Sequence, residues 1–181
     1  MFSLLVFLGN PGRRYAMTRH NFGWMVCDHV TAGLKATWTG KFHGLYTDIG
    51  AGSGKAFVLK PATFMNECGR SVAALINFYK ISPSHILVVH DELELPFGRI
   101  ELKAGGGTAG HNGLRSIKKH IGTDAFHRLR LGIGRPQRMQ VSSYVLSRFS
   151  EDEEARLPDI CEQAGQILID VLSKKGGKPG D

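Results

Sequence analysis

The chain has 181 residues, a length that suffices for one domain and is short for two. Of these residues, 42% are hydrophobic and 22% are charged, which are ordinary values for a globular protein. It has no run of about 18 apolar residues, so no membrane-spanning helix is expected. Its net charge of +7 is unevenly placed: residues 99–138 hold nine basic and two acidic side chains, whereas residues 151–170 hold one basic and seven acidic, which predicts one face that attracts a polyanion, or else a merely solvated basic surface.

The first half of the chain predicts three strands and two helices. Residues 3–9, SLLVFLG, form a buried strand that ends in the turn GNPG, because Asn, Pro and Gly each favour a bend. Apolar residues recur at loosely helical spacing over 21–34. Segments 40–50 and 55–60 are typical of strands and predict a hairpin. A helix follows Pro61, with the apolar face Cys68, Val72, Leu75, Ile76 and Tyr79.

The second half continues with strands around a glycine-rich loop. Residues 85–92, HILVVHDE, and 98–103, GRIELK, are typical of strands. The loop 104–113, AGGGTAGHNG, follows them and leads into a short basic helix over 114–122. Residues 127–134, HRLRLGIG, predict a further strand.

The last predicted element is a helix that opens on the acidic run SEDEEARL. Ser150 and Glu153 stand three positions apart, which is the capping-box pattern. Strands interspersed with helices, together with a hairpin, predict one α/β domain over residues 1–173, a sandwich with a mixed, mostly parallel twisted sheet flanked by helices. The tail 174–181, KKGGKPGD, is expected to be mobile.

The cysteines and the N-terminus bear on the cellular compartment. Cys27, Cys68 and Cys161 have no CxxC spacing, and their odd number argues against a disulfide framework. The apolar start MFSLLVFLGN is short and lacks the basic region and cleavage site of a signal peptide. We therefore expect a cytoplasmic protein with reduced thiols.

The sharpest candidate site pairs His20 with Asp91. Asp91 lies at the C-terminal end of an apolar strand, where open α/β sheets place functional groups. A carboxylate there can accept a hydrogen bond from an imidazole, fix its tautomer and stabilise the imidazolium. His20 would then act as a general base near neutral pH. A lone histidine in a turn is otherwise an ordinary surface residue.

No nucleophile accompanies this pair. The chain has no GxSxG motif and its cysteines fall in predicted helices, so a base at His20 would take its proton from water in a direct hydrolysis. The tetrahedral intermediate would need hydrogen-bond donors, and neutral amides suit that task. Four asparagines lie at predicted turns or helix starts, where each could equally be a turn former or a cap: Asn10, Asn21, Asn66 and Asn112.

Two kinds of cofactor site are weighed and set aside. The stretch AGGGTAGHNG lacks the Lys-Ser/Thr ending of a P-loop and the context of a dinucleotide loop. Acidic residues and histidines between 85 and 94 suggest a metal site, but His90 and Asp91 are neighbours in a strand and point to opposite faces. We therefore expect neither a nucleotide cofactor nor a metal.

Five ordered blocks span about residue 4 to residue 149: FLGNPGRRYAMTRHNFGW, KPATFMNECGRSV, HDELELPFGRIELKAGGGTAGHNGLRSI, RLRLGIGRP and YVLSRF. Together they closely resemble the blocks of the bacterial-type peptidyl-tRNA hydrolases. The resemblance implies a monomeric, cofactor-free enzyme that cleaves the ester between a peptide and the 3′ ribose of tRNA, recycling tRNA from chains dropped by stalled ribosomes. Phe7 stands where the family often has Gly, and Cys68 where Ser is usual, and neither supplies proposed chemistry.

Carried over by position, the resemblance assigns catalytic roles within these motifs. His20 in TRHN is the general base, and Asp91 in HDEL is the carboxylate that orients it. Three amides hold the peptide, the attacking water and the oxyanion: Asn10, Asn66 and Asn112.

The resemblance also assigns binding roles. Tyr15 and Met65 match residues that shape the site and place the tRNA terminus. Lys103 and Arg130 match basic residues linked to the 5′ phosphate of the tRNA, and both lie in the basic block 99–138. Two further residues of the same motifs are expected to bind substrate: Asn21 and His111.

Three other functions remain open at this point. A non-enzymatic RNA-binding protein could use the same fold, because a scaffold can be kept while turnover is lost. A metal- or nucleotide-dependent hydrolase would lose activity on chelation or would require a nucleoside triphosphate. An esterase of small substrates would not need the basic block.

Overall fold

The computed structural model describes residues 2–34, 36–51 and 54–173, and its element order confirms the predicted α/β class. Seven strands form one sheet in the order β2-β3-β4-β1-β5-β7-β6. Their bounds are β1 Leu4–Phe7, β2 Thr39–Lys41, β3 Gly44–Ala51, β4 Gly54–Pro61, β5 Ile86–Glu92, β6 Ile100–Ala104 and β7 His127–Gly132. The expected mobile tail, 174–181, lies outside the described residues.

The sheet is mixed and mostly parallel, as predicted. Strand β1 pairs in parallel with β4 and β5, and β5 pairs in parallel with β7. Strand β3 runs antiparallel to its neighbours β2 and β4, which confirms the predicted hairpin, and the edge strand β6 runs antiparallel to β7. The crossover connections that join the parallel strands carry the helices.

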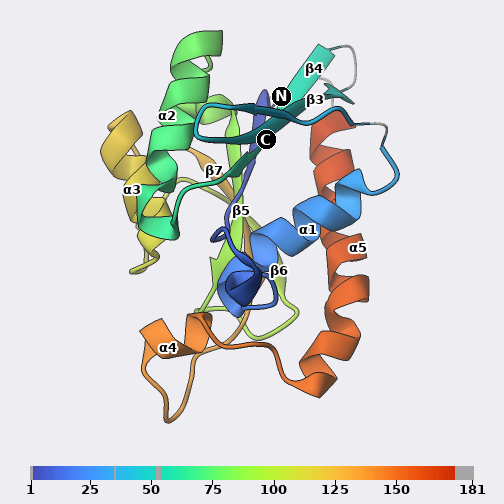
Figure 1. Ribbon diagram of the computed structural model, residues 1–181, viewed down its shortest axis with the longest axis vertical. Helices are drawn as coiled ribbons and strands as arrows, with labels where there is room; N and C mark the ends of the chain where they lie inside the picture. The colour runs from blue at the N-terminus through green and yellow to red at the C-terminus, as the bar shows by residue number, and fades with distance from the viewer. Residues whose placement is uncertain (1, 35, 52–53, 174–181) are drawn as a thin grey trace, which may run out of the picture.

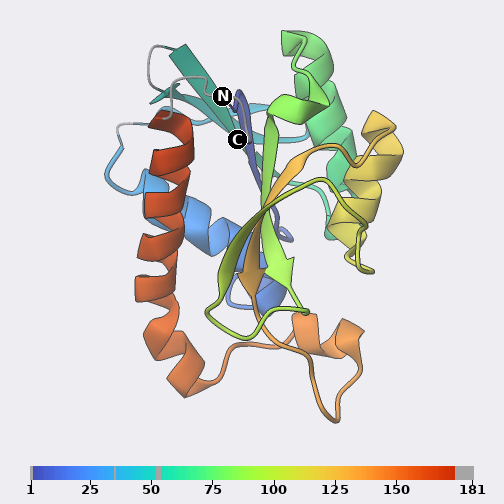
Figure 2. The same cartoon turned by 180° about the vertical axis from the view of Figure 1, so that it is seen from behind.

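Helices cover both faces of this sheet, as Figures 1 and 2 show from opposite sides. Their bounds are α1 Phe22–Thr31, α2 Cys68–Tyr79, α3 Asn112–Ile121, α4 Val141–Val145 and α5 Glu151–Ser173. Helices α1 and α5 pack on one face, and α2 and α3 pack on the other. In the described residues, no helix combines the length and the apolar character that crossing a membrane requires.

Strand β1 shows why the sheet lies at the centre. All four residues of LLVF are buried, with Leu5 and Phe7 in the α1/α5 core and Leu4 and Val6 in the α2/α3 core. A strand whose side chains alternate between two apolar layers reads as a continuous hydrophobic run, which is typical of a parallel sheet covered on both faces.

The structure departs from the sequence reading in two places. We expected one strand across 40–50, but the chain turns back at Phe42 and His43, whose φ angles are 57° and 54°. Neither residue is a usual turn former, and Phe42 is held there by ring contacts with Tyr46 and Tyr79. Helix α4 was not predicted at all. By contrast, the capping box before α5 is confirmed by reciprocal bonds between Ser150 and Glu153.

The topology leaves an opening at the carboxyl ends of β1 and β5. These strands are neighbours, yet the chain leaves β1 toward the β2–β4 side of the sheet and leaves β5 toward β6 and β7 at the other edge. A crevice at such a switch point is the usual place for a site in an open α/β sheet.

Candidate active site

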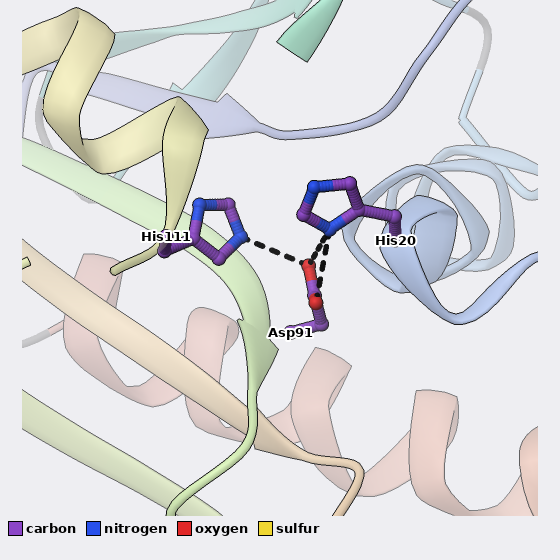
Figure 3. A group of neighbouring side chains, drawn as sticks. All are labelled: His20, Asp91 and His111. Atoms are coloured by element: carbon purple, nitrogen blue, oxygen red, sulfur yellow. Dashed lines mark hydrogen bonds and ion pairs between the residues drawn. The ribbon is translucent and has the colours of Figure 1, made fainter. Parts of the chain in front are cut away.

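His20 lies at this switch point, in a 3₁₀ turn that joins the loop after β1 to α1. The residue is 6% exposed, and its Nδ1 is 3.0 Å from both Oδ1 and Oδ2 of Asp91 (Figure 3). Because a carboxylate only accepts hydrogen bonds, Nδ1 carries the proton and donates it. The lone pair of the neutral ring is therefore left on Nε2.

Asp91 stands near the end of β5 between two imidazoles. Its side chain is buried, and its Oδ1 also lies 3.0 Å from Nε2 of His111 (Figure 3). Burial alone would raise the pKa of the Asp91 carboxyl, but the neighbouring His20 and His111 hold it below its usual range. The carboxylate is therefore charged at neutral pH and fully engaged by donors.

His111 is held in one tautomer by the helix that follows it. Its Nδ1 accepts hydrogen bonds from the main-chain N–H groups of Gly113, at 3.1 Å, and Leu114, at 3.4 Å, and so caps α3. Since Nδ1 accepts, the proton is on Nε2 and points at Asp91. We expected His111 only as a substrate-binding residue. It does line a cavity, but its bonds show that it also holds the carboxylate.

The pair of His20 and Asp91 has the electrostatics of a base and its orienting group. Burial lowers the pKa of the His20 imidazole, but the charge and hydrogen bond of Asp91 outweigh burial and the pKa is raised. An imidazole held in this way readily accepts a proton at Nε2, and the imidazolium that forms is stabilised.

The side chain of His90 bonds the main chain of Asp91. Its Nδ1 donates a hydrogen bond of 2.7 Å to the carbonyl oxygen of Asp91, and its ring meets that of His111 edge-on, with 5.0 Å between centroids. Burial lowers the pKa of His90 to about 3, so its ring is neutral at physiological pH. A neutral, buried ring adds no positive charge that would offset the negative charge of the Asp91 carboxylate.

Three side chains of the described residues could together hold a metal ion: His20, Asp91 and His111. Their donor atoms lie within 4.8 Å of one another. An ion on Nε2 of His111 would need the lone pair of that nitrogen. The ring proton would then move to Nδ1, where it would face the N–H groups of Gly113 and Leu114. The donor set therefore favours hydrogen bonding over metal ligation.

Asn10 and Asn21 form a second linked pair behind His20. The Asn21 side chain donates to the carbonyl oxygen of Asn10 at 3.0 Å and accepts from the N–H of Asn10 at 2.9 Å. Asn21 is a predicted substrate-binding residue; in the structure it is 1% exposed, and both ends of its amide are bonded to the main chain of Asn10. Asn10 in turn accepts a bond of 2.7 Å from the N–H of Met65 through Oδ1, so its amide nitrogen is the group that remains for the cleft.

A cavity of about 240 Å³ brings most of the remaining predicted residues together around His20. Tyr15 and Phe64 meet edge-on above it, with 6.3 Å between ring centroids. Asn66 lies in a 3₁₀ turn before α2, and Asn112 is the first residue of α3, so both amides reach the cavity from helix starts. The predicted residues on its lining are Asn10, Tyr15, His20, Met65, Asn66 and Asn112.

A second cavity of about 350 Å³ adjoins the first on the other side of His20. Asp91, His111 and residues of the glycine-rich loop line it. Ser142 and Val145 of α4 line both cavities, as do His20 and Asn112. Ser142 and Val145 were not predicted from the sequence, although Val145 belongs to the last matched block, YVLSRF, and Ser142 lies two residues before it.

The glycine-rich loop owes its composition to its path. Gly105, Gly106 and Gly110 have φ angles of 58°, 101° and 81°, a region that side chains other than hydrogen disfavour. The buried guanidinium of Arg128 donates to the carbonyl oxygens of Gly106 and Gly107 and fixes the loop from behind. The glycines thus allow the turn that carries the chain to His111.

The two predicted phosphate-binding residues differ in their surroundings. Lys103 is exposed on the edge strand β6. Arg130 is mostly buried, and its Nε and Nη1 donate to Glu92 at 2.8 Å and to Glu101 at 2.5 Å. Two carboxylates therefore already balance the charge of Arg130. Lys103 is thus exposed to solvent, whereas Arg130 lies in an ion-pair network with Glu92 and Glu101, and both remain predicted phosphate ligands.

Comparisons with known proteins show the family to which this chain belongs. Residues 4–178 match the family model described as peptidyl-tRNA hydrolase. The peptidyl-tRNA hydrolase of Sorangium cellulosum is 49% identical over 94% of this chain and 78% of its own, and that of Mycobacterium tuberculosis H37Rv is 46% identical over 97% and 93%. The crystal structure of the peptidyl-tRNA hydrolase of Acinetobacter baumannii superposes with a TM-score of 0.81 at 39% identity, over 95% of this chain and 92% of that one. This chain belongs to the bacterial-type peptidyl-tRNA hydrolase family of enzymes.

Proposed function

We propose that the protein hydrolyses the ester bond of peptidyl-tRNA, with His20 as the general base that activates water and with no covalent intermediate. The observation that carries this proposal is the His20–Asp91 pair, in which Nδ1 is bonded to a buried carboxylate while the ring lines both cavities. The Nε2 lone pair of such a ring can accept a proton from a molecule bound where the two cavities meet.

The reaction begins at the ester carbonyl. Nε2 of His20 removes a proton from a water molecule as that water attacks the carbonyl carbon, and Asp91 stabilises the resulting imidazolium. The carbonyl oxygen becomes an oxyanion, which needs donors that carry no competing charge. The Oδ1 of Asn10 is bonded to Met65, so its amide nitrogen is available for this purpose, and the exposed residues Asn66 and Asn112 line the same cavity.

Collapse of the tetrahedral intermediate breaks the bond to the ribose oxygen. The imidazolium of His20 returns its proton to that oxygen, which leaves as the hydroxyl of the tRNA 3′ end, and the peptide leaves with a free carboxylate. Atoms and charge balance without a cofactor, because water supplies the new oxygen and His20 only carries the proton from one oxygen to the other.

The thiols are poor candidates for a covalent route. Burial raises the pKa of Cys27 and Cys68 to about 12 and that of Cys161 to about 11, so all three are protonated at neutral pH. In the part of the chain that the structure describes, the hydrogen-bonded partner of the His20 ring is Asp91, and no hydroxyl or thiol is bonded to it. Water is therefore the nucleophile that the site accommodates.

Release of peptide from N-acetyl-aminoacyl-tRNA, with and without EDTA, is the direct test. We expect wild-type protein to cleave the ester equally well in both conditions, because the hydrogen bonds of His111 leave no lone pair on its Nε2 for a metal ion. Loss of cleavage in EDTA, restored by a divalent cation, would replace this mechanism with a metal-dependent one. Binding of tRNA without any cleavage would instead favour an RNA-binding protein that has kept the fold.

Lys103 is expected to contribute to tRNA binding rather than to chemistry. Replacing Lys103 with alanine should weaken the affinity for peptidyl-tRNA and reduce the slope of log K against log salt by about 1, because one phosphate contact is lost. Filter binding at several salt concentrations measures both quantities. Lys55→Ala is the matched control, since Lys55 is also exposed but lies on β4 and pairs with Asp48. An equal change in both variants would show a general charge effect and no defined contact at Lys103.

A further inference from the structure

Residues 141–147, here called the wall segment, contribute to the lining of both cavities beside the 3₁₀ turn that carries His20. Ser142 and Val145 line both cavities, Val141 lines the larger one and Leu146 the smaller one. Figure 1 shows α4, which makes up most of this segment, standing apart from the helices that cover the sheet. The size of both cavities therefore depends on where the wall segment sits.

The wall segment is only partly packed: Tyr144 and Val145 are half-buried against the α1/α5 core, and the Tyr144 hydroxyl donates to the carbonyl oxygen of Ile133 at 2.6 Å. Helix α4 contains five residues and none of them is buried. A helix of that length is also too short to be stable by itself. Contacts from outside the segment must therefore hold it in place.

Arg19, the residue before His20, supplies several further contacts. It is 7% exposed, and its Nη1 donates to Oγ of Ser147 at 2.9 Å and to the carbonyl oxygen of Arg148. Its main-chain N–H donates to the carbonyl oxygen of Ser147 at 3.0 Å. Its guanidinium also lies over the ring of Tyr144, 4.4 Å from the centroid.

The second half of the guanidinium reaches the start of α5. Nη2 of Arg19 is 2.5 Å from Oε2 of Glu153, and that same oxygen accepts the N–H of Ser150 at 2.8 Å in the capping box. The ion pair is largely buried at Arg19, so it is screened little by solvent. One side chain thus joins the wall segment and the first turn of α5 to the turn that carries His20.

We propose that Arg19 is a positioning residue that sets the distance between the wall segment and His20, and through it the affinity for the substrate. Arg19 and His20 are successive residues of one 3₁₀ turn, so the residue that bonds the wall segment and the proposed base are fixed by the same short stretch of backbone. The inference rests on the proposed function, because substrate affinity is measured with peptidyl-tRNA. Arg19 touches neither the ester nor Asp91, and it leaves the proton transfer unaffected.

Arg19→Met tests this role, since methionine keeps an unbranched side chain and removes the donors. We expect KM for N-acetyl-aminoacyl-tRNA to rise about tenfold while kcat changes by less than about twofold, the pattern of a loss of uniform binding. The pH at which kcat is half-maximal should not move, because the His20–Asp91 pair is intact. Hydrogen exchange of the amides of residues 141–147 should speed up in the same variant.

Two further variants make the test specific. Arg148→Met removes a charge from the neighbouring exposed side chain, which pairs with Glu154, and should leave KM, kcat and exchange at wild-type values. Glu153→Gln keeps the shape of the partner and removes its charge, so it should raise KM less than Arg19→Met does. It also carries the test if Arg19→Met does not fold.

The outcomes separate this inference from the proposed function. Wild-type protein that does not cleave the ester would overturn the proposed function. Active wild-type protein with an unchanged KM in both Arg19→Met and Glu153→Gln would overturn the role of Arg19 alone. A fall in kcat at constant KM, or a shifted pH profile, would also overturn it, because Arg19 would then act on His20 and not on the wall segment.

Discussion

Replacing His20 with alanine is expected to lower kcat for peptidyl-tRNA hydrolysis by about 10²–10⁴-fold, the usual contribution of a general base. Water that attacks without a base must lose its proton to solvent, and the leaving ribose oxygen loses its proton donor in the same variant. Affinity for tRNA should stay within about twofold, because the exposed lysines and the amides of the cavity are unchanged. Single-turnover release of peptide and equilibrium binding of tRNA measure the two effects separately.

His29→Ala is the matched control for this result. His29 is an exposed histidine on α1 that pairs with Glu162 and lines neither of the two cavities at His20, so its loss should leave kcat unchanged. Retention of substantial turnover in His20→Ala would remove His20 from the mechanism. Complete loss of both turnover and tRNA binding would show that the residue supports the fold of the cleft, and circular dichroism would then be needed to measure the folded fraction.

Asp91→Asn should have the second largest effect, a fall in kcat of about 10²–10⁴-fold. Two imidazole N–H groups point at this carboxylate, and an asparagine offers one oxygen and a competing NH₂ group in its place. One ring must therefore change tautomer, and for His20 that change moves the lone pair from Nε2 to Nδ1. The tautomer that takes a proton from water becomes the rarer one.

The same variant should shift the pH profile in a defined direction. The base acts when unprotonated, so kcat rises as pH passes upward through the pKa of His20. In the wild type Asp91 raises that pKa against the opposing effect of burial, so removing the charge leaves burial to lower it. The midpoint of the residual activity should therefore move to lower pH. Asp124→Asn, which removes an exposed carboxylate paired with Lys118, should change neither rate nor midpoint, and a midpoint in Asp91→Asn at or above the wild-type value would contradict the orienting role.

Most of the fold could be predicted because local patterns carry it. Alternating burial of LLVF in β1, the apolar face of α2 and the capping box at Ser150 each follow from a few neighbouring residues. The turn at Phe42 and His43 could not, since ordinary turn residues are missing and distant aromatic rings hold the backbone there. Helix α4 was missed for a related reason: five mostly exposed residues carry no apolar period, and Arg19 holds them from far away in the sequence.

The candidate site was predictable in its residue types and less so in its contacts. The pairing of His20 with Asp91 followed from strand position and chemistry, and the resemblance named the amides. The bonds that hold several of the predicted residues are tertiary and leave no local signal: Asn21 to the main chain of Asn10, His111 to Asp91, and Arg130 to Glu92. In each case a side chain expected at the substrate is engaged by another part of the protein.

The distance along the chain between His20 and its partner has a consequence for synthesis. The hydrogen-bonded residues are separated by 71 positions, and the wall segment is made later still. Because a chain leaves the ribosome N-terminus first, His20 emerges well before Asp91, His111 and the wall segment can close around it. The site is therefore incomplete until residues 141–147 have been synthesised, so a nascent chain that ends before them carries His20 without the side chains that complete its surroundings.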